Sequence, residues 1–163
     1  MVISVIWIIR KATSCGLFFA RRKINMQYDN LIEQIKSDEG ERLRVYKCSE
    51  GFNTIGFGRN LDTNGISKQE AEMLLINDLH RVEEGLQRNE LINGHDYVRR
   101  AVLYNMAFQM GINGLLRFEK MIAAYRIGDY RTAAEEMLDS LWATQATKRA
   151  KRLSDQMLTG EWQ

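Results

Sequence analysis

The sequence of 163 residues contains no proline and only two cysteines. Because proline interrupts helices more strongly than any other residue, its absence favours a helical protein. Two cysteines are too few for a disulfide-stapled scaffold. Hydrophobic residues make up 45% of the chain and charged residues 27%, which excludes intrinsic disorder and collagen-like repeats. The length fits one domain or two small lobes around a shared helix.

Motifs for metals and nucleotides are also missing. The two histidines, His80 and His95, belong to no HExxH motif, and Cys15 and Cys48 form no CxxC pair. Each histidine is interpreted as a solvated surface group. Neither GxxxxGK(S/T) nor GxGxxG occurs, and the Gly-Phe-Gly at 56–58 does not precede a predicted helix. The sequence therefore predicts no metal, no organic cofactor and no nucleotide.

Acidic residues are absent from residues 1–25, which carry five basic ones. The remainder holds 18 of the 23 basic and all 21 acidic residues, so attraction to nucleic acid is not expected. The apolar runs at 2–9 and 15–20 are shorter than the ~18–20 residues that span a bilayer, and their flanks do not match a secretory signal. Three interpretations of this extension stay open: a weak membrane anchor, a non-native or upstream-translated leader before Met26, or an internal packed helix.

The next part of the chain is predicted to form a small hairpin lobe over about 40–66. Apolar residues between 28 and 36 recur at helical spacing and predict a short amphipathic helix that ends near Glu39. The hydrophobic period then changes to two, so residues 42–58 are predicted to form a β-hairpin. The Asp-Thr-Asn-Gly sequence at 62–65 predicts a turn.

The rest of the chain is predicted to be helical. Ser67 and Glu70 form a capping box at the start of a long linking helix over about 67–89. A helical lobe over about 95–163 follows, with Asp129 as one of its helix N-caps. Its helices are expected at about 97–110, 115–126, 130–142 and 147–159.

The last predicted helix carries a basic cluster, which is the strongest candidate for nucleic-acid binding. No aromatic residue that could stack on bases is interleaved with it. The cluster is therefore interpreted as a solvated face that complements an acidic preceding helix. It consists of Lys148, Arg149, Lys151 and Arg152, and the acidic residues are Glu135, Glu136 and Asp139.

Glu39 is the clearest candidate for acid–base chemistry. It lies at a predicted helix end beside a hairpin that carries Cys48 and Thr54, and such a junction can open a cleft. Hydrolysis of a glycosidic bond needs a proton donor on the leaving oxygen and a second group on the other face of the sugar. Glu39 can supply the first if its surroundings keep it protonated. The alternative is an ordinary surface glutamate.

Three stretches, in order, resemble the T-even phage lysozyme family. The first comprises Asp38-Glu39-Gly40, Leu43 to Lys47 and Glu-Gly-Phe-Asn-Thr-Ile-Gly-Phe-Gly at 50–58. The others comprise Val-Arg-Arg-Ala at 98–101, Asn-Met-Ala-Phe-Gln-Met-Gly at 105–111, Trp142, the basic cluster, and Thr-Gly-Glu-Trp at 159–162. The resemblance implies a lysozyme-like α+β fold, mostly helical, over residues 26–163. A long helix would join the small β-hairpin lobe to the C-terminal helical lobe.

The resemblance also assigns roles to individual residues. Glu39 matches the catalytic general acid, and Thr54 matches the threonine that helps to position the attacking water. Cys48 stands where the family has its catalytic aspartate, and it would act as base or nucleophile in its place. Two further residues, Phe108 and Gln109, match substrate-binding residues of the helical lobe. Arg149 matches a supporting arginine that pairs with the catalytic glutamate.

Several positions depart from the family pattern. Asn60, Met121 and Glu136 differ from the residues that line the sugar cleft, so no binding role is carried over to them. Some endolysins of this kind are held inactive by a disulfide until they leave the membrane. A bond between Cys15 and Cys48 is therefore a further hypothesis.

The function implied is that of a muramidase, an endolysin that hydrolyses the β-1,4 bond between N-acetylmuramic acid and N-acetylglucosamine. Such a bacteriolytic, antimicrobial enzyme is made in the host cytoplasm, acts on the wall in the periplasm and lyses the phage-infected host. Its partner is bacterial peptidoglycan, with no nucleic acid and no cofactor, and a monomer is expected. Membrane association would be weak and would use residues 1–25. The alternative is a non-hydrolytic peptidoglycan-binding relative inactivated at Cys48.

Overall fold

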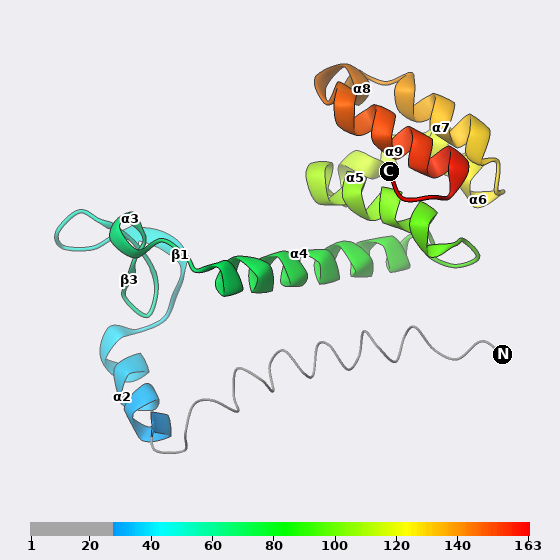
Figure 1. The fold of residues 1–163 in the computed structure, drawn as a ribbon. Coiled ribbons are helices and arrows are strands. Elements are labelled where there is room, and N and C mark those ends of the chain that lie inside the picture. Colours follow the sequence, from blue (N-terminus) through cyan, green and yellow to red (C-terminus); the bar gives the residue numbers. More distant parts are fainter. Residues whose placement is uncertain (1–27) are drawn as a thin grey trace. The chain divides into compact units, whose positions relative to one another are not determined.

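The computed structural model describes residues 28–163 (Figure 1). The predictions for residues 1–25, including the proposed bond from Cys15, lie outside the described residues. The chain divides into two compact units, the first ending at Ile66 and the second comprising Ser67–Gln163. The predicted α+β, mostly helical class is confirmed, because the described chain combines many helices with one small antiparallel sheet.

The first unit begins with helix α2 (Asp29–Glu39). It confirms the helix predicted over 28–36 and ends three residues later, at the expected Glu39. Gly40 terminates it in a left-handed conformation (φ +68°), and its N–H donates to the Lys36 carbonyl at 3.0 Å. Glycine adopts this conformation without steric cost, which places the Glu39 side chain on the last turn of the helix.

Three antiparallel strands follow, in the order β1 (Arg42–Lys47), β2 (Asn53–Gly56) and β3 (Arg59–Asn60). The first two confirm the predicted hairpin, whereas the third strand was not predicted. The turn predicted at 62–65 is wrong: a short helix, α3 (Leu61–Asn64), occupies this stretch. Its cause is local, since the Asn60 side chain accepts a hydrogen bond from the Thr63 N–H at 3.1 Å and caps the helix.

The described part of the first unit has almost no interior. Thr54 is its one buried residue, at 3% exposure. The alternation of apolar and polar residues that predicted β1 does not produce a buried face in this strand, because Leu43 and Val45 remain 76% and 54% exposed. Local turns and hydrogen bonds therefore hold this unit together more than apolar burial does.

The second unit is entirely helical in its regular structure. Its elements are α4 (Lys68–Arg88), α5 (Tyr97–Leu116), α6 (Glu119–Arg126), α7 (Tyr130–Leu138), α8 (Leu141–Gln145) and α9 (Thr147–Thr159). The long helix expected over 67–89 and the last one over 147–159 are confirmed. No helix among residues 28–163 is both long enough and apolar enough to cross a membrane.

Two boundaries in the second unit differ from the prediction. The helix expected to end at 110 is interrupted there, because Gly111 has non-helical φ and ψ of 76° and 163°, but α5 resumes after this kink and ends at Leu116. The next helix starts at Glu119 rather than 115. The helix expected over 130–142 breaks after Leu138. The Ser140 hydroxyl accepts from the Ala143 N–H at 3.1 Å and starts α8 instead.

Both predicted helix caps are confirmed. The Ser67 hydroxyl accepts from the Glu70 N–H at 3.2 Å, and the Glu70 carboxylate accepts from the Ser67 N–H at 2.7 Å, which completes the capping box of α4. At the start of α7, the Asp129 carboxylate accepts from the Thr132 N–H at 3.1 Å. Hydrogen bonds from Thr132 lower the pKa of Asp129 and keep this cap charged.

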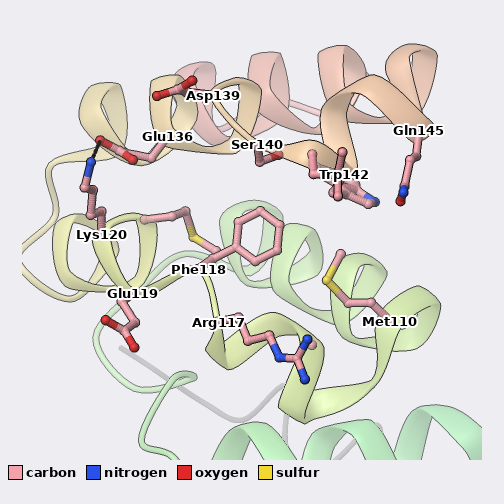
Figure 2. Close-up of a pocket in the computed structure, with 13 residues that line it drawn as sticks. Met110, Arg117, Phe118, Glu119, Lys120, Glu136, Asp139, Ser140, Trp142 and Gln145 are labelled. Atoms are coloured by element: carbon pink, nitrogen blue, oxygen red, sulfur yellow. Dashed lines mark ion pairs between the residues drawn. The ribbon is translucent and has the colours of Figure 1, made fainter.

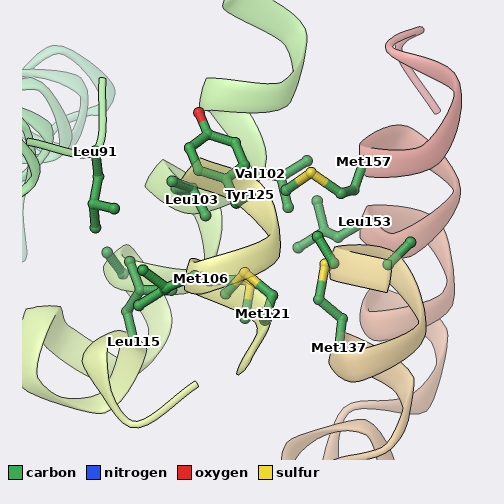
Figure 3. Packing of buried hydrophobic residues seen from close by; sticks show 14 of the residues in the cluster. Leu91, Val102, Leu103, Met106, Leu115, Met121, Tyr125, Met137, Leu153 and Met157 are labelled. Atoms are coloured by element: carbon green, nitrogen blue, oxygen red, sulfur yellow. The ribbon is translucent and has the colours of Figure 1, made fainter. Parts of the chain in front are cut away.

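One hydrophobic core supports the second unit (Figure 3). Side chains from α5, α6, α7 and α9 fill it, while α4 contributes only near its C-terminal end, through Val82 and Leu86. Full burial of one such side chain is worth about 1.5–3 kcal/mol. The largest members include Leu103, Met106, Met121, Tyr125, Met137, Leu153 and Met157.

Candidate functional site

The last turn of α2 brings Glu39 next to the turn between β2 and β3. Gly58 lies in this turn with φ +76°, and a Cβ added there would be only 2.8 Å from the Glu39 Oε2. A Cβ at this distance would force the Glu39 carboxylate to shift, so the absence of a side chain at Gly58 leaves the carboxylate its present position. The structure thus places the predicted general acid against the backbone of the small sheet.

Cys48 and Thr54 lie together at the other end of the hairpin. The Cys48 N–H donates to the Phe52 carbonyl at 3.0 Å, and the Gly51 N–H donates to the Cys48 carbonyl at 2.9 Å. The β1–β2 register pairs Tyr46 with Thr54, and the Thr54 hydroxyl donates to the Phe52 carbonyl at 3.1 Å. This tight turn fixes the position of the thiol.

The turn also stabilises the ionised form of the Cys48 thiol. Backbone hydrogen bonds from Glu50 and Phe52 lower its pKa most, and the Thr54 side chain lowers it further, although desolvation opposes them. The thiol is free and its residue is half-buried. A thiolate in this position can accept a proton or attack an electrophilic carbon. Among the described residues, Glu39 makes no hydrogen bond with Cys48 or Thr54.

An additional polar clamp supports Thr54, and the sequence analysis did not identify it. The N–H and the side-chain Nδ2 of Asn53 donate to the two Asp62 carboxylate oxygens at 2.8 and 2.9 Å. These two hydrogen bonds lower the pKa of Asp62. They tie α3 to the residue immediately before Thr54. In the sequence, the only sign of this clamp is Asp62, which belongs to the Asp-Thr-Asn-Gly motif that was interpreted as a turn.

The second unit contains a pocket of about 640 Å³ between α5, α6, α7 and α8 (Figure 2). Its lining includes apolar Met110, Phe118 and Trp142. The Trp142 Nε1 donates to the Gln109 Oε1 at 3.1 Å, so this candidate residue fixes the indole ring. An apolar lining with a few convergent polar groups is typical of a ligand site.

Charged residues surround the same pocket. Lys120 and Glu136 form an ion pair with an N–O distance of 3.8 Å, and Asp139 lies near them in the lining (Figure 2). Met121 and Glu136, two positions to which the sequence analysis assigned no role, both line this pocket. Phe108 lines a separate hollow of about 270 Å³ beside α4. The structure therefore assigns Phe108 and Gln109, although adjacent in sequence, to different surroundings.

The basic cluster forms an exposed face of α9, as predicted. No ion pair within residues 28–163 joins the cluster to Glu135, Glu136 or Asp139, so their complementarity stays a prediction. Glu136 instead pairs with Lys120 of α6. Arg149 is exposed on this face, and its pairing with Glu39 stays a prediction.

His95 is partly buried and its side chain contacts two tyrosines, which the interpretation as a solvated surface group did not include. Its ring lies 3.9 Å from the Tyr125 ring centroid, and its Nδ1 is 2.9 Å from the Tyr130 hydroxyl. Burial lowers the pKa of His95 and favours the neutral imidazole. His80, on α4, is only partly buried. No group of three or more potential metal ligands occurs in residues 28–163.

Comparison with known proteins adds evidence for the family. The phage lysozyme family model matches residues 36–156. Probable T4-type lysozymes 1 and 2 of Dictyostelium discoideum are 29% and 30% identical over 78% and 80% of this chain, and the matches cover 93% and 95% of those proteins. The pre-baseplate central spike protein Gp5 of Enterobacteria phage T4 is 31% identical over 80% of this chain, which spans only 28% of that protein. The match extends from the end of α2 into α9, so the chain belongs to the phage lysozyme family.

Proposed function

We propose that this protein is a lysozyme that hydrolyses the β-1,4 bond between N-acetylmuramic acid and N-acetylglucosamine in peptidoglycan. The observation that carries the proposal is the hairpin that holds Cys48, with its lowered thiol pKa, against buried Thr54. The same unit positions Glu39 through Gly40 and Gly58. Membership of the phage lysozyme family supports these roles. If Glu39 were an ordinary surface glutamate and Cys48 an unrelated cysteine, their match to the catalytic positions of the family would have no explanation.

In the proposed reaction, Glu39 donates a proton to the glycosidic oxygen as its bond to the anomeric carbon breaks. The Cys48 thiolate removes a proton from a water molecule, and the water oxygen forms the new bond to that carbon. Thr54 orients this water through its hydroxyl. Direct attack by the thiolate would instead give a thioglycoside that water then hydrolyses.

The pocket beside Trp142 is proposed to bind another part of the wall polymer. Its apolar lining suits the face of a sugar ring or the side chain of a stem peptide, and Lys120 and Glu136 can bind charged groups. Gln109 holds Trp142 for this contact. The biological setting proposed is lysis of a phage-infected bacterium by a monomer that acts on its cell wall.

The experiment is release of new reducing ends from purified peptidoglycan by the full chain, with and without Glu39→Gln. General acid catalysis contributes roughly 10²–10⁴-fold, so we expect the variant to lose at least about 100-fold. Glu33→Gln is the matched control, because Glu33 lies on the same helix and pairs only with Lys36 among the described residues. Equal activity of wild type and Glu39→Gln would reject the assignment.

The alternative, a peptidoglycan-binding relative inactivated at Cys48, makes the opposite prediction for Cys48→Asp. An active wild type should tolerate this change, because the carboxylate can also act as base. An inactive wild type that gains hydrolysis on Cys48→Asp would establish the alternative. The lowered thiol pKa favours the hydrolase, because it keeps the group ionised at lower pH.

A further inference from the structure

Two large aromatic side chains of the second unit contact each other while remaining open to solvent. Tyr97 is the first residue of α5, and Trp162 lies in the tail after α9, with ring centroids 5.8 Å apart at an interplanar angle of 63°. Their exposed fractions are 59% and 61%. Neither residue lines the two pockets described above.

The tail that carries Trp162 is held by specific contacts. Arg99 of α5 donates from Nε to the Met157 carbonyl at 2.8 Å and from Nη2 to the Leu158 carbonyl at 3.0 Å. Gly160 then turns the chain in a left-handed conformation (φ +73°), and a Cβ there would collide with the Arg99 guanidinium. The tail therefore returns toward α5 along a defined path, with the C-terminus marked in Figure 1.

Positive charge lies at the edge of this aromatic pair. Arg152 is exposed and its Nη1 donates to the Gln163 carbonyl at 3.4 Å, one residue beyond Trp162. It makes no ion pair within the described residues. The Arg100 guanidinium lies 5.9 Å from the Tyr97 ring centroid. An anionic group bound beside the rings would thus meet the guanidinium groups of Arg100 and Arg152.

We propose that Tyr97, Trp162 and Arg152 form a second binding surface for the glycan strand of peptidoglycan. An edge-to-face contact occupies at most one face of one ring, so the other ring faces are available to the apolar face of a pyranose. The guanidinium of Arg152 suits the carboxylates that muramic acid and its stem peptide carry at regular intervals. The identity of this ligand rests on the proposed function.

This surface would retain the enzyme on an insoluble polymer between cleavage events. Neither Glu39 nor Cys48 takes part in it, so its contribution is to binding and not to the chemical step. Linking two weak contacts to one polymer raises the overall affinity without any change at the first site. Losing the surface should therefore reduce action on whole sacculi more than action on short soluble fragments.

The test is co-sedimentation of the full chain, carrying Glu39→Gln, with purified peptidoglycan sacculi. We expect Tyr97→Ala and Trp162→Ala each to weaken binding about 3- to 10-fold, the range that one aromatic contact supports. Trp162→Phe should retain binding, and Arg152→Gln should weaken it mainly at low salt. Tyr28→Ala is the control, because Tyr28 is an aromatic residue of similar exposure, 52%, in the other unit.

Each result decides between the possibilities. Unchanged sacculus binding by Tyr97→Ala and Trp162→Ala, with wild-type melting temperatures, would overturn the inference. The inference would also be overturned if the parent protein were a dimer in gel filtration and these variants were monomers, because the surface would then bind a second copy of the chain. Binding of single-stranded DNA but not of sacculi would overturn it as well, because the ligand would then be a nucleic acid. The proposed function is tested separately, by release of reducing ends from the protein with native Glu39. If the protein binds sacculi through Tyr97, Trp162 and Arg152 but releases no reducing ends, the proposed lysozyme activity is rejected and the binding surface is retained.

Discussion

Gly58 shows how the lack of a side chain can control a neighbouring acid. We expect Gly58→Ala to displace the Glu39 carboxylate and to reduce lytic activity by more than tenfold, because the new Cβ would be 2.8 Å from Oε2. The positive φ adds a backbone cost of about 1–2 kcal/mol. Gly94→Ala has a similar φ of +81° but no neighbour within 4 Å. It should therefore lose comparable stability and keep its activity, with both variants measured by the fall in turbidity of a peptidoglycan suspension.

The hydrogen bonds to Cys48 predict a pH dependence. Because they lower the thiol pKa, alkylation by iodoacetamide should reach half its maximal rate below the pH of about 8.5 that an ordinary cysteine requires. Thr54→Val removes one donor and should move the profile to higher pH, although the backbone donors remain. The measurement is made on Cys15→Ser protein, with Thr63→Val as control. A profile centred at or above 8.5 in the parent would contradict the prediction.

Individual residues also show what the sequence could predict about the site. Glu39, Cys48 and Thr54 are close in sequence, and one helix end and one hairpin determine their positions. The Asn53–Asp62 clamp escaped prediction because its two residues join only after α3 forms. The surroundings of His95 depend on tyrosines from α6 and α7, 30 and 35 residues further along the chain.

At the scale of elements, the capping box of α4 provides a quantitative prediction. Ser67→Ala removes the hydroxyl that accepts from the Glu70 N–H, and we expect the free energy of unfolding to fall by about 1 kcal/mol. Ser37→Ala is the control, because Ser37 lies exposed within α2 and alanine suits a helix interior. Urea denaturation followed by circular dichroism gives both values. Equal midpoints for the two variants would mean that the cap does not stabilise the fold.

Elements were predictable where local chemistry determines them. The capping residues, the hairpin and the glycine at the end of α2 all act within a few residues of their own position. The break at Gly111 lies where the predicted helix was expected to end, whereas the break before Ser140 was missed because hydrophobic spacing continues through it. At Ser140, a hydroxyl that donates to the Met137 carbonyl at 2.7 Å and accepts from Ala143 outweighs that spacing.

For the whole molecule, His95 predicts loss of stability in acid. Burial lowers its folded pKa, and Arg100 lowers it further although Asp96 opposes this. The neutral form is therefore favoured on folding, so its stabilisation is complete above the unfolded pKa of about 6.5. That stabilisation is lost as pH falls from there towards the folded pKa. Tyr125 and Tyr130, from α6 and α7, are the other titratable groups that face it.

The measurement is the melting temperature between pH 7.5 and pH 5. We expect a steeper fall for the wild type than for His95→Gln, which cannot gain a proton and keeps a polar group near Tyr130. His80→Gln is the control for the other histidine. Parallel curves for wild type and His95→Gln would show that this histidine does not determine the acid sensitivity.

The scarcity of buried side chains in the described part of the first unit has a consequence for the enzyme in use. The residues proposed to cleave the polymer lie where only Thr54 is buried, whereas the apolar core belongs to the helical unit. Regions with few buried contacts open at lower free energy than the rest of a protein. On warming, catalysis should therefore fail while most of the helical signal persists. The working lifetime of the enzyme would then depend on its hairpin, and reinforcing the helical core would do little to extend it.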